Sequence, residues 1–192
     1  MVTDTLLEAE LRELAGSVPD PELPVLTLAE LGVLRDVQVE GPGRVTVRLT
    51  PTYTGCPAIE AMSADIERVL HDHGVPEVSV VTVLAPAWST DDISAEGRRK
   101  LAEFGIAPPR AHSADGGPVP LTLSVRCPHC GSIAPPRAHS ADGGPVPLTL
   151  SVRCPHCGST DTELLSRFSS TACKALRRCV ACREPFDHFK EL

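Results

Sequence analysis

Three Cys-x-x-Cys pairs constrain what this chain can fold into more than any other feature of its sequence. They are Cys127/Cys130, Cys154/Cys157 and Cys179/Cys182, and two further cysteines, Cys56 and Cys173, stand alone. In a reducing compartment, paired spacing of this kind indicates metal ligation before it indicates disulfides. Each pair presents two thiolates from one tight turn, so two pairs complete the tetrahedron that Zn²⁺ prefers. The C-terminal part of the chain is therefore expected to fold around a metal ion.

Short strand patterns surround the last two pairs, at Glu163–Phe168, Ala175–Arg178 and Phe186–Phe189. The two pairs are separated by 21 residues, from 158 to 178, and this alternation of strands and cysteine turns is the layout of a zinc ribbon. We predict one structural zinc ion, held by Cys154, Cys157, Cys179 and Cys182. Ligand type alone leaves open an iron ion bound in the same way.

The first Cys-x-x-Cys pair belongs to an exact internal duplication, in which Ile106–Ser132 and Ile133–Ser159 match at all 27 positions. Pairing Cys127/Cys130 with the last pair would loop out 48 residues, from 131 to 178. The added closure cost is only about 0.7 kcal/mol, so entropy does not exclude this alternative half-site. Strand continuity decides for the second copy, because the residues after Ser159 continue as a ribbon, whereas those after Ser132 return to linker composition.

The residues before the duplication combine helix and strand patterns. Helices are expected at Thr5–Ala15, Thr27–Leu34, Pro57–His73 and Ile93–Phe104, and strands at Arg44–Leu49 and Val78–Leu84. We predict an α+β fold in which a small α/β domain at 1–105 is followed by a β-rich zinc ribbon at 146–192. Residues 106–145 are rich in Pro, Gly, Ala and Ser and are expected to form a linker that contains the first, orphan pair.

Charge and hydropathy exclude several classes of partner. The net charge of -7 argues against a broad nucleic-acid surface, which needs a basic face. The N-terminus is acidic where a signal peptide is basic, and no apolar run approaches the roughly 18 residues of a membrane span. We therefore expect a soluble cytoplasmic protein with neither a nucleic-acid nor a membrane partner.

Cys56 lies between a predicted strand and the helix that begins near Pro57. The free amides and the dipole of a helix start favour a thiolate, and Gly55 lets the backbone bend so that the sulfur stays accessible. From this pattern alone, a reactive thiol and a small buried residue at a tight turn are equally good interpretations. Cys173 is better explained as structural filler, with a role beside the ribbon or in partner binding as the alternative.

Four motifs of the first domain resemble the small domain shared by metal–sulfur cluster assembly proteins. They are Asp20-Pro-Glu-Leu-Pro-Val25, Leu31-Gly32-Val33, Thr50-Pro-Thr-Tyr-Thr-Gly-Cys-Pro57 and Trp88-Ser-Thr-Asp-Asp-Ile-Ser94. Two later motifs, Ser170-Thr-Ala-Cys-Lys-Ala175 and Cys182-Arg-Glu-Pro-Phe-Asp-His-Phe-Lys190, extend the likeness. With them, the chain resembles the D subunits, also called J, of the phenylacetyl-CoA oxygenase/epoxidase system. The resemblance covers about Leu11–Pro109 and Val146–Lys190.

The resemblance implies a non-catalytic role in maturing a diiron monooxygenase that epoxidises the ring of phenylacetyl-CoA. Proteins of this kind are thought to help assemble or insert an iron–sulfur cluster, with the oxygenase and reductase subunits as partners. The matching functional residue is Cys56 of the Gly-Cys-Pro motif, with Asp20 and Glu22 nearby, and the implied cargo is a transient iron–sulfur cluster. A homodimer is left open.

Two departures from the family pattern are visible. The family has a single copy of the 27-residue segment, and it commonly carries a further cysteine after Phe-Lys near the end. Here the chain reads Lys190-Glu191-Leu192, so we expect no role for a terminal thiol.

Two other functions compete with maturation. The first is a zinc-ribbon regulator that binds nucleic acid, although residues 160–192 carry six basic and five acidic side chains and are nearly neutral. The second is an enzyme with Cys56 as its nucleophile, although no histidine is placed by the sequence to act as the base.

Overall fold

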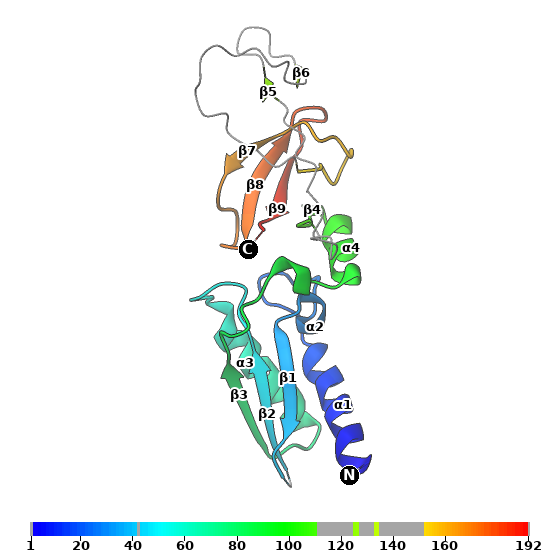
Figure 1. Cartoon of the computed structure of the whole chain (residues 1–192), viewed down its shortest axis with the longest axis vertical. Coiled ribbons are helices and arrows are strands. Elements are labelled where there is room, and N and C mark those ends of the chain that lie inside the picture. Colours follow the sequence, from blue (N-terminus) through cyan, green and yellow to red (C-terminus); the bar gives the residue numbers. More distant parts are fainter. Residues whose placement is uncertain (1, 42, 111–124, 127–132, 135–151, 192) are drawn as a thin grey trace.

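A three-stranded sheet and a four-stranded sheet form opposite ends of an elongated molecule (Figure 1). The computed structural model describes residues 2–41, 43–110, 125–126, 133–134 and 152–191. None of the helices in these ranges is both long enough and apolar enough to cross a membrane.

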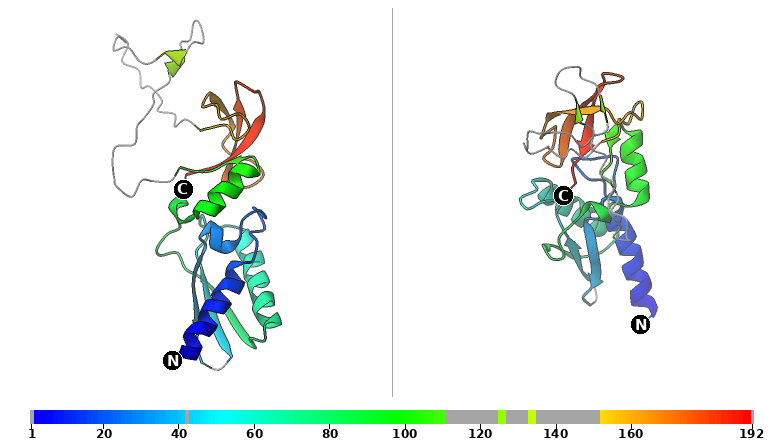
Figure 2. Two further views of the ribbon diagram at one scale, coloured as in Figure 1. Left: turned by 90° about the vertical axis from the view of Figure 1, so that its right-hand side faces the viewer. Right: turned by 45° about the horizontal axis from the view of Figure 1, so that its top comes forward.

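The first sheet has the order β1-β2-β3. Strand β1 (Leu34–Val39) runs antiparallel to β2 (Arg44–Leu49), and β2 runs parallel to β3 (Glu77–Thr82). Because parallel strands need a crossover, helix α3 (Ala58–Asp72) connects β2 to β3. Helix α1 (Val2–Gly16) contacts α3, and Figure 2 shows the two helices alongside the sheet.

The core between helices and sheet follows the two periodicities in the sequence. In β2, Val45, Val47 and Leu49 alternate and are almost fully buried, as expected for one face of a strand. In α3, Met62, Ile66 and Leu70 are spaced four residues apart and form one buried stripe. The patterns at Arg44–Leu49 and Pro57–His73 thus predicted these two elements closely.

Three short elements close the domain on the side of the ribbon. They are helix α2 (Leu28–Leu31), the 3₁₀ turn η1 (Thr90–Asp92) and helix α4 (Ala95–Glu103). Thr27 and Glu30 form a capping box at the start of α2, and Gly32 ends the helix with a φ of 76°. The indole Nε1 of Trp88 donates to the Leu31 carbonyl at 2.9 Å.

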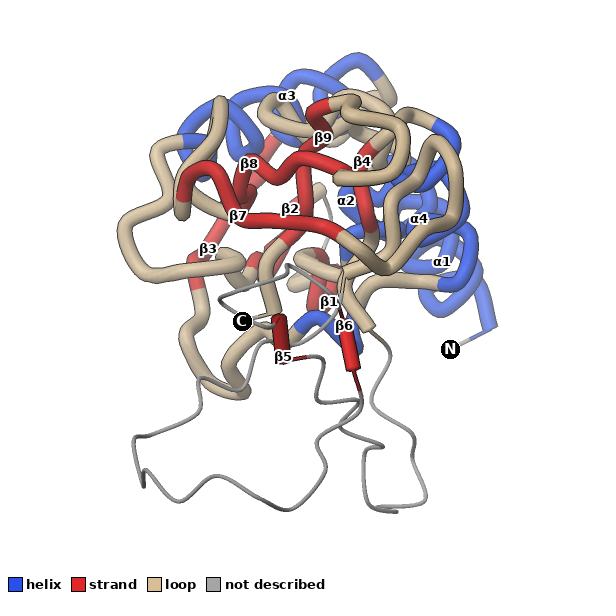
Figure 3. The backbone as a smooth tube through the Cα atoms, turned by 90° about the horizontal axis from the view of Figure 1, so that it is seen from above, coloured by secondary structure: helices blue, strands red, loops and turns tan. Residues whose placement is uncertain are grey.

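The ribbon sheet has the order β4-β9-β8-β7, and Figure 3 shows its strands from above. Its members are β4 (Ile106–Ala107), β7 (Thr162–Ser166), β8 (Lys174–Cys179) and β9 (Pro185–Phe189). Strands β7, β8 and β9 are antiparallel neighbours, whereas β4 pairs parallel to β9. Separately, β5 (Val125–Arg126) and β6 (Ile133–Ala134) pair with each other. The predicted α+β fold class is confirmed.

The expected linker differs from the structure at its first residues. Ile106 and Ala107 are buried and form β4, so the chain enters the ribbon sheet directly after α4. This two-residue strand was not predicted because the residues that follow it are rich in proline. It forms because it pairs with its neighbour β9, not because of a strand pattern in its own sequence. Strand β1 was also not predicted, because Leu34–Val39 mixes charged and apolar residues.

The two sheets share one hydrophobic core. Cys173 and Phe189 of the ribbon are buried in the same apolar cluster as Leu31, Met62 and Trp88 of the first domain. A second, smaller cluster lies around the cysteine turns of the ribbon. The ribbon is therefore packed against the first domain through side chains from β9 and from the residue before β8.

Candidate functional site

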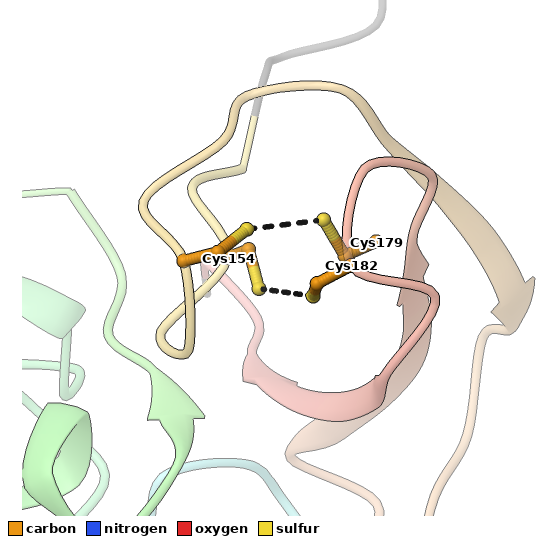
Figure 4. Close-up of side chains that lie close together, drawn as sticks. Cys154, Cys179 and Cys182 are labelled. Carbon is orange, nitrogen blue, oxygen red and sulfur yellow. Dashed lines mark hydrogen bonds between the residues drawn. The ribbon is translucent and has the colours of Figure 1, made fainter.

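Four cysteine sulfurs meet where two loops of the ribbon face each other. Cys154 and Cys157 come from the loop before β7, Cys179 ends β8, and Cys182 lies in the turn between β8 and β9. Their Sγ atoms all lie within 4.8 Å of one another. Figure 4 shows Cys154 opposite Cys179 and Cys182.

The spacing of the sulfurs matches a tetrahedral zinc ion. The Sγ–Sγ distances are 3.8 Å for Cys154–Cys182 and 3.5 Å for Cys157–Cys179. Four sulfurs at 2.3 Å from a central Zn²⁺ would lie about 3.8 Å apart, whereas a disulfide bond is about 2.05 Å long. The expected structural zinc with four cysteine ligands fits this site.

Both loops turn through left-handed backbone directly after their second cysteine. Gly158 has a φ of 75°, and Arg183 occupies the corresponding position after Cys182 with a φ of 65°. The Gly158 amide donates to the Cys154 carbonyl, and the Cys179 amide donates to the Glu184 carbonyl. These bonds fix the turns so that each pair of thiols points into the centre.

The acidity of these thiols is uneven. The Cys182 amide donates to the Cys179 sulfur and lowers the pKa of that thiol to about 7. The Glu184 amide lowers the pKa of the Cys182 thiol. Burial and the neighbouring thiols outweigh this effect and raise that pKa to about 12. A divalent cation at the centre would favour ionisation of all four thiols, because it offsets the repulsion between thiolates.

The alternative half-site, Cys127 and Cys130, lies outside the described residues. The four-cysteine cluster described above contains the pair from the second copy of the repeat, Cys154 and Cys157.

A second group of reactive side chains lines a small cavity between the first domain and the ribbon. It includes the three residues predicted from the resemblance, Cys56, Asp20 and Glu22, together with Cys173 from the ribbon. No local pattern in the sequence indicates that Cys173 belongs here, because its position depends on how the ribbon packs.

Cys56 precedes α3, as predicted, and is half-buried. Its pKa is raised rather than lowered: burial is the largest cause, and the Glu22 and Asp20 carboxylates add to it. The Ala58 amide and the Tyr53 hydroxyl act in the opposite direction but are weaker than the burial effect. The helix start thus favours the thiolate, as its position indicates, but burial and the two carboxylates, which the local pattern does not reveal, favour the protonated thiol more strongly.

Asp20 is 4% exposed and sits in the loop before α2. Its Oδ1 accepts hydrogen bonds from the amides of Glu22 and Leu23 at 2.9 and 2.7 Å. Burial nevertheless raises the pKa of Asp20 above its usual range. The pKa of Glu22 is also raised, first by burial and then by the Asp20 charge.

Family models match both parts of the chain. Residues 8–85 match the model described as iron-sulfur cluster assembly protein, and residues 144–190 match the PaaD zinc beta ribbon domain. The second match contains all four cysteines of the zinc cluster.

The most informative relative spans nearly the whole chain. It is a protein of Escherichia coli (strain K12) provisionally named as the D subunit of 1,2-phenylacetyl-CoA epoxidase, and it is 42% identical over 94% of this chain and 91% of its own length. A Porphyromonas gingivalis protein named Fe-S protein maturation auxiliary factor is 33% identical over 49% of this chain and 90% of its own length.

Among solved structures, a domain of unknown function DUF59 from Bacillus anthracis is 27% identical, with a TM-score of 0.49. The similarity covers 52% of this chain and 95% of that one. Because the relative from Escherichia coli is similar across both domains, the chain belongs to the family of phenylacetyl-CoA epoxidase D subunits, which joins an iron–sulfur cluster assembly domain to a PaaD zinc ribbon.

Proposed function

We propose that this chain is a non-catalytic maturation subunit of the phenylacetyl-CoA ring-epoxidising monooxygenase system. In this role it assists the assembly or insertion of an iron–sulfur cluster, and its partners are the oxygenase and reductase subunits. The observation that carries the proposal is the cavity that brings Cys56 together with the carboxylates of Asp20 and Glu22 in a domain of the cluster-assembly family.

The chemistry of this cavity suits iron that is bound transiently rather than permanently. The thiols and carboxylates that line it are a mixed sulfur and oxygen set rather than four enclosing thiolates, so it can take up iron and release it again. The zinc centre of the ribbon is different, because its four cysteines would enclose the ion and leave no open position. When bound, zinc supplies structural cross-linking of the two ribbon loops.

The same cavity offers little for catalysis by Cys56. No histidine is among the described residues that line it, so the thiol has no neighbouring imidazole base there. The carboxylates that are present raise the thiol pKa instead of lowering it. These features support an accessory protein over an enzyme with a cysteine nucleophile.

The direct test is cluster loading of the apo-reductase under anaerobic conditions with ferrous iron and sulfide. Visible absorption of the cluster and bound iron are followed with no added chain, with the wild-type chain and with Cys56→Ser. We expect the wild-type chain to accelerate loading and Cys56→Ser to return the rate to that of the reductase alone. Equal loading in all three samples would rule the proposal out.

A matched pair of charge variants controls for general effects on the fold. Glu22→Gln removes a carboxylate that lines the cavity, whereas Glu60→Gln removes an exposed one from the first turn of α3. We expect slower loading with Glu22→Gln and unchanged loading with Glu60→Gln.

A further inference from the structure

Three loops meet at the junction of the two domains, around the cavity that Cys56 lines. They are 50–57 after β2, 83–89 after β3 and 167–173 between β7 and β8, and each is named below by one of its residues: the Cys56 loop, the Leu84 loop and the Phe168 loop. Because β2 and β3 are parallel, the loops that follow them leave the same edge of the sheet, and Figure 1 shows this edge facing the ribbon. Open sheets commonly bind their ligands at such an edge. In the proposed function, a protein that receives cargo from Cys56 approaches the chain at these loops.

Arg35 holds the Cys56 loop and the Leu84 loop together. Its Nε donates to the Thr50 hydroxyl at 3.0 Å, and its Nη2 donates to the Ala87 carbonyl at 3.4 Å. One guanidinium thus bridges the first residue of one loop and the backbone of the other. The position of the Leu84 loop beside the candidate site is therefore fixed by hydrogen bonds.

Lys190 ties the Phe168 loop to the same cavity. Its amide donates to the carbonyl of Cys173 at 2.9 Å, and Cys173 lines the cavity together with Cys56. The ammonium nitrogen of Lys190 lies 4.7 Å from the centre of the Phe168 ring, in a cation–π contact. The ring is therefore anchored to the residue that binds the backbone of Cys173.

The two loops that flank the Cys56 loop each expose a large apolar side chain. Leu84 is 60% exposed and Phe168 is 64% exposed. Single exposed apolar side chains are common on protein surfaces, so exposure alone indicates nothing. These two, however, come from different domains and lie on the loops that surround one candidate site. Apolar side chains in such a position are typical of the centre of a protein–protein interface.

The Phe168 loop also presents positive charge. Arg167 is exposed, and it forms no ion pair with any residue that the structure describes. The Lys190 ammonium likewise has no carboxylate partner in the described part of the chain. The Leu84 loop begins Val-Leu-Ala-Pro-Ala, without a charged residue. The surface is thus apolar on one side and apolar with a basic rim on the other, and its complement carries apolar side chains next to Asp or Glu.

We propose that the Leu84 loop and the Phe168 loop form the docking surface for the acceptor of the cargo, the reductase subunit. The reductase covers Leu84 and Phe168 with apolar side chains and pairs carboxylates with Arg167 and Lys190. This inference rests on the proposed function, whose acceptor it names. The ribbon then has a second duty besides holding zinc, because it supplies half of the surface that orients the acceptor over Cys56.

The test measures binding of the zinc-loaded chain to the apo-reductase by anaerobic titration calorimetry. Leu84→Ala and Phe168→Ala should each raise the dissociation constant about tenfold, as expected for apolar side chains at the centre of an interface. Arg167→Glu should weaken binding more at low salt than at high salt, because salt screens exposed charges. Zinc content and thermal unfolding check that each variant is folded.

Phe104→Ala is the matched control for loss of exposed apolar surface. Phe104 is 66% exposed and directly follows α4, which Figures 1 and 3 show on the other side of the molecule from β3 and β7. This variant should bind the reductase with the affinity of the wild type.

Three results would overturn the docking surface: no binding by the wild-type chain, unchanged affinity in Leu84→Ala/Phe168→Ala, or equal weakening by Phe104→Ala. Cluster loading of the reductase separates this inference from the proposed function. Accelerated loading that is the same for the wild type and for Leu84→Ala/Phe168→Ala at limiting concentrations would refute the surface alone. Binding that depends on Leu84 and Phe168, without any acceleration of loading by the wild type, would refute the maturation role and leave the surface as a contact with the reductase.

Discussion

The indole ring of Trp88 lies 6.0 Å, centroid to centroid, from the phenyl ring of Phe189, at an angle of 49°. Trp88 belongs to the first domain and Phe189 ends the last strand of the ribbon, so this aromatic pair joins the two domains. The pair lies within the separation and tilt that favour aromatic contacts. Because Phe189 also lines the cavity of Cys56 and Cys173, the packing of the domains and the geometry of the candidate site depend on the same side chain.

Phe189→Ala should destabilise the whole protein, not the ribbon alone. Phe189 is 0% exposed, and truncation of a buried phenylalanine to alanine typically costs about 3–5 kcal/mol. We expect the free energy of unfolding in urea to fall by this amount. Phe168→Ala is the control, because Phe168 is 64% exposed and its contact with Lys190 lies at the protein surface. A smaller loss for Phe189→Ala than for Phe168→Ala would contradict a shared core.

The sequence predicted the parts of the structure that depend on local pattern. The helix at Pro57–His73 and the strand at Arg44–Leu49 followed from periodicity, and the zinc cluster followed from cysteine spacing. These features need little information from distant residues.

The parts that were missed depend on contacts between distant segments. Cys173 resembled structural filler because nothing near it in the sequence reveals that the start of β8 packs beside Cys56. Strand β4 is only two residues long and exists because β9 lies beside it. The raised pKa of Cys56 likewise owes part of its shift to Asp20 and Glu22, more than thirty positions earlier in the chain.

Gly32→Ala should destabilise the first domain strongly. Gly32 has a φ of 76°, and an added Cβ would lie 2.3 Å from the Asp92 carbonyl oxygen. Gly74→Ala is a matched control, since Gly74 has a φ of 86° but no atom within 4 Å of the added Cβ. Both variants should lose roughly 1–2 kcal/mol from left-handed backbone strain, and Gly32→Ala should lose roughly 1–3 kcal/mol more from the clash. Equal losses in thermal or urea unfolding would show that η1 can move away from Gly32.

Stability should fall as the pH is lowered from about 6.5 to about 4 because of His188. Burial, with the Arg177 and Arg110 charges, lowers the pKa of His188 to about 4. The pKa is depressed in the folded state, so between these two values the unfolded chain binds a proton that the folded chain excludes. The loss approaches roughly 3 kcal/mol at the lower end of the window.

Urea unfolding at several pH values measures this effect. His188→Gln should flatten the slope between pH 6.5 and 4, whereas His73→Gln, which removes an exposed histidine, should preserve it. The cysteines of the zinc centre are present in all three proteins, so their contribution cancels in the comparison. A slope that persists in His188→Gln would assign the pH dependence to other groups.

Zinc should depend on the second copy of the repeat and not on the first. Cys154 and Cys157 meet Cys179 and Cys182 within 4.8 Å, so all four ligands of one tetrahedral ion are supplied without the earlier pair. We expect one zinc per chain in the wild type and in Cys127→Ser/Cys130→Ser, measured by elemental analysis of the purified protein. Cys154→Ser/Cys157→Ser should lose the zinc and, with it, the cooperative unfolding of the ribbon, because the small ribbon core depends on the ion. Retention of zinc in this last variant together with its loss in Cys127→Ser/Cys130→Ser would reverse the assignment of the two copies.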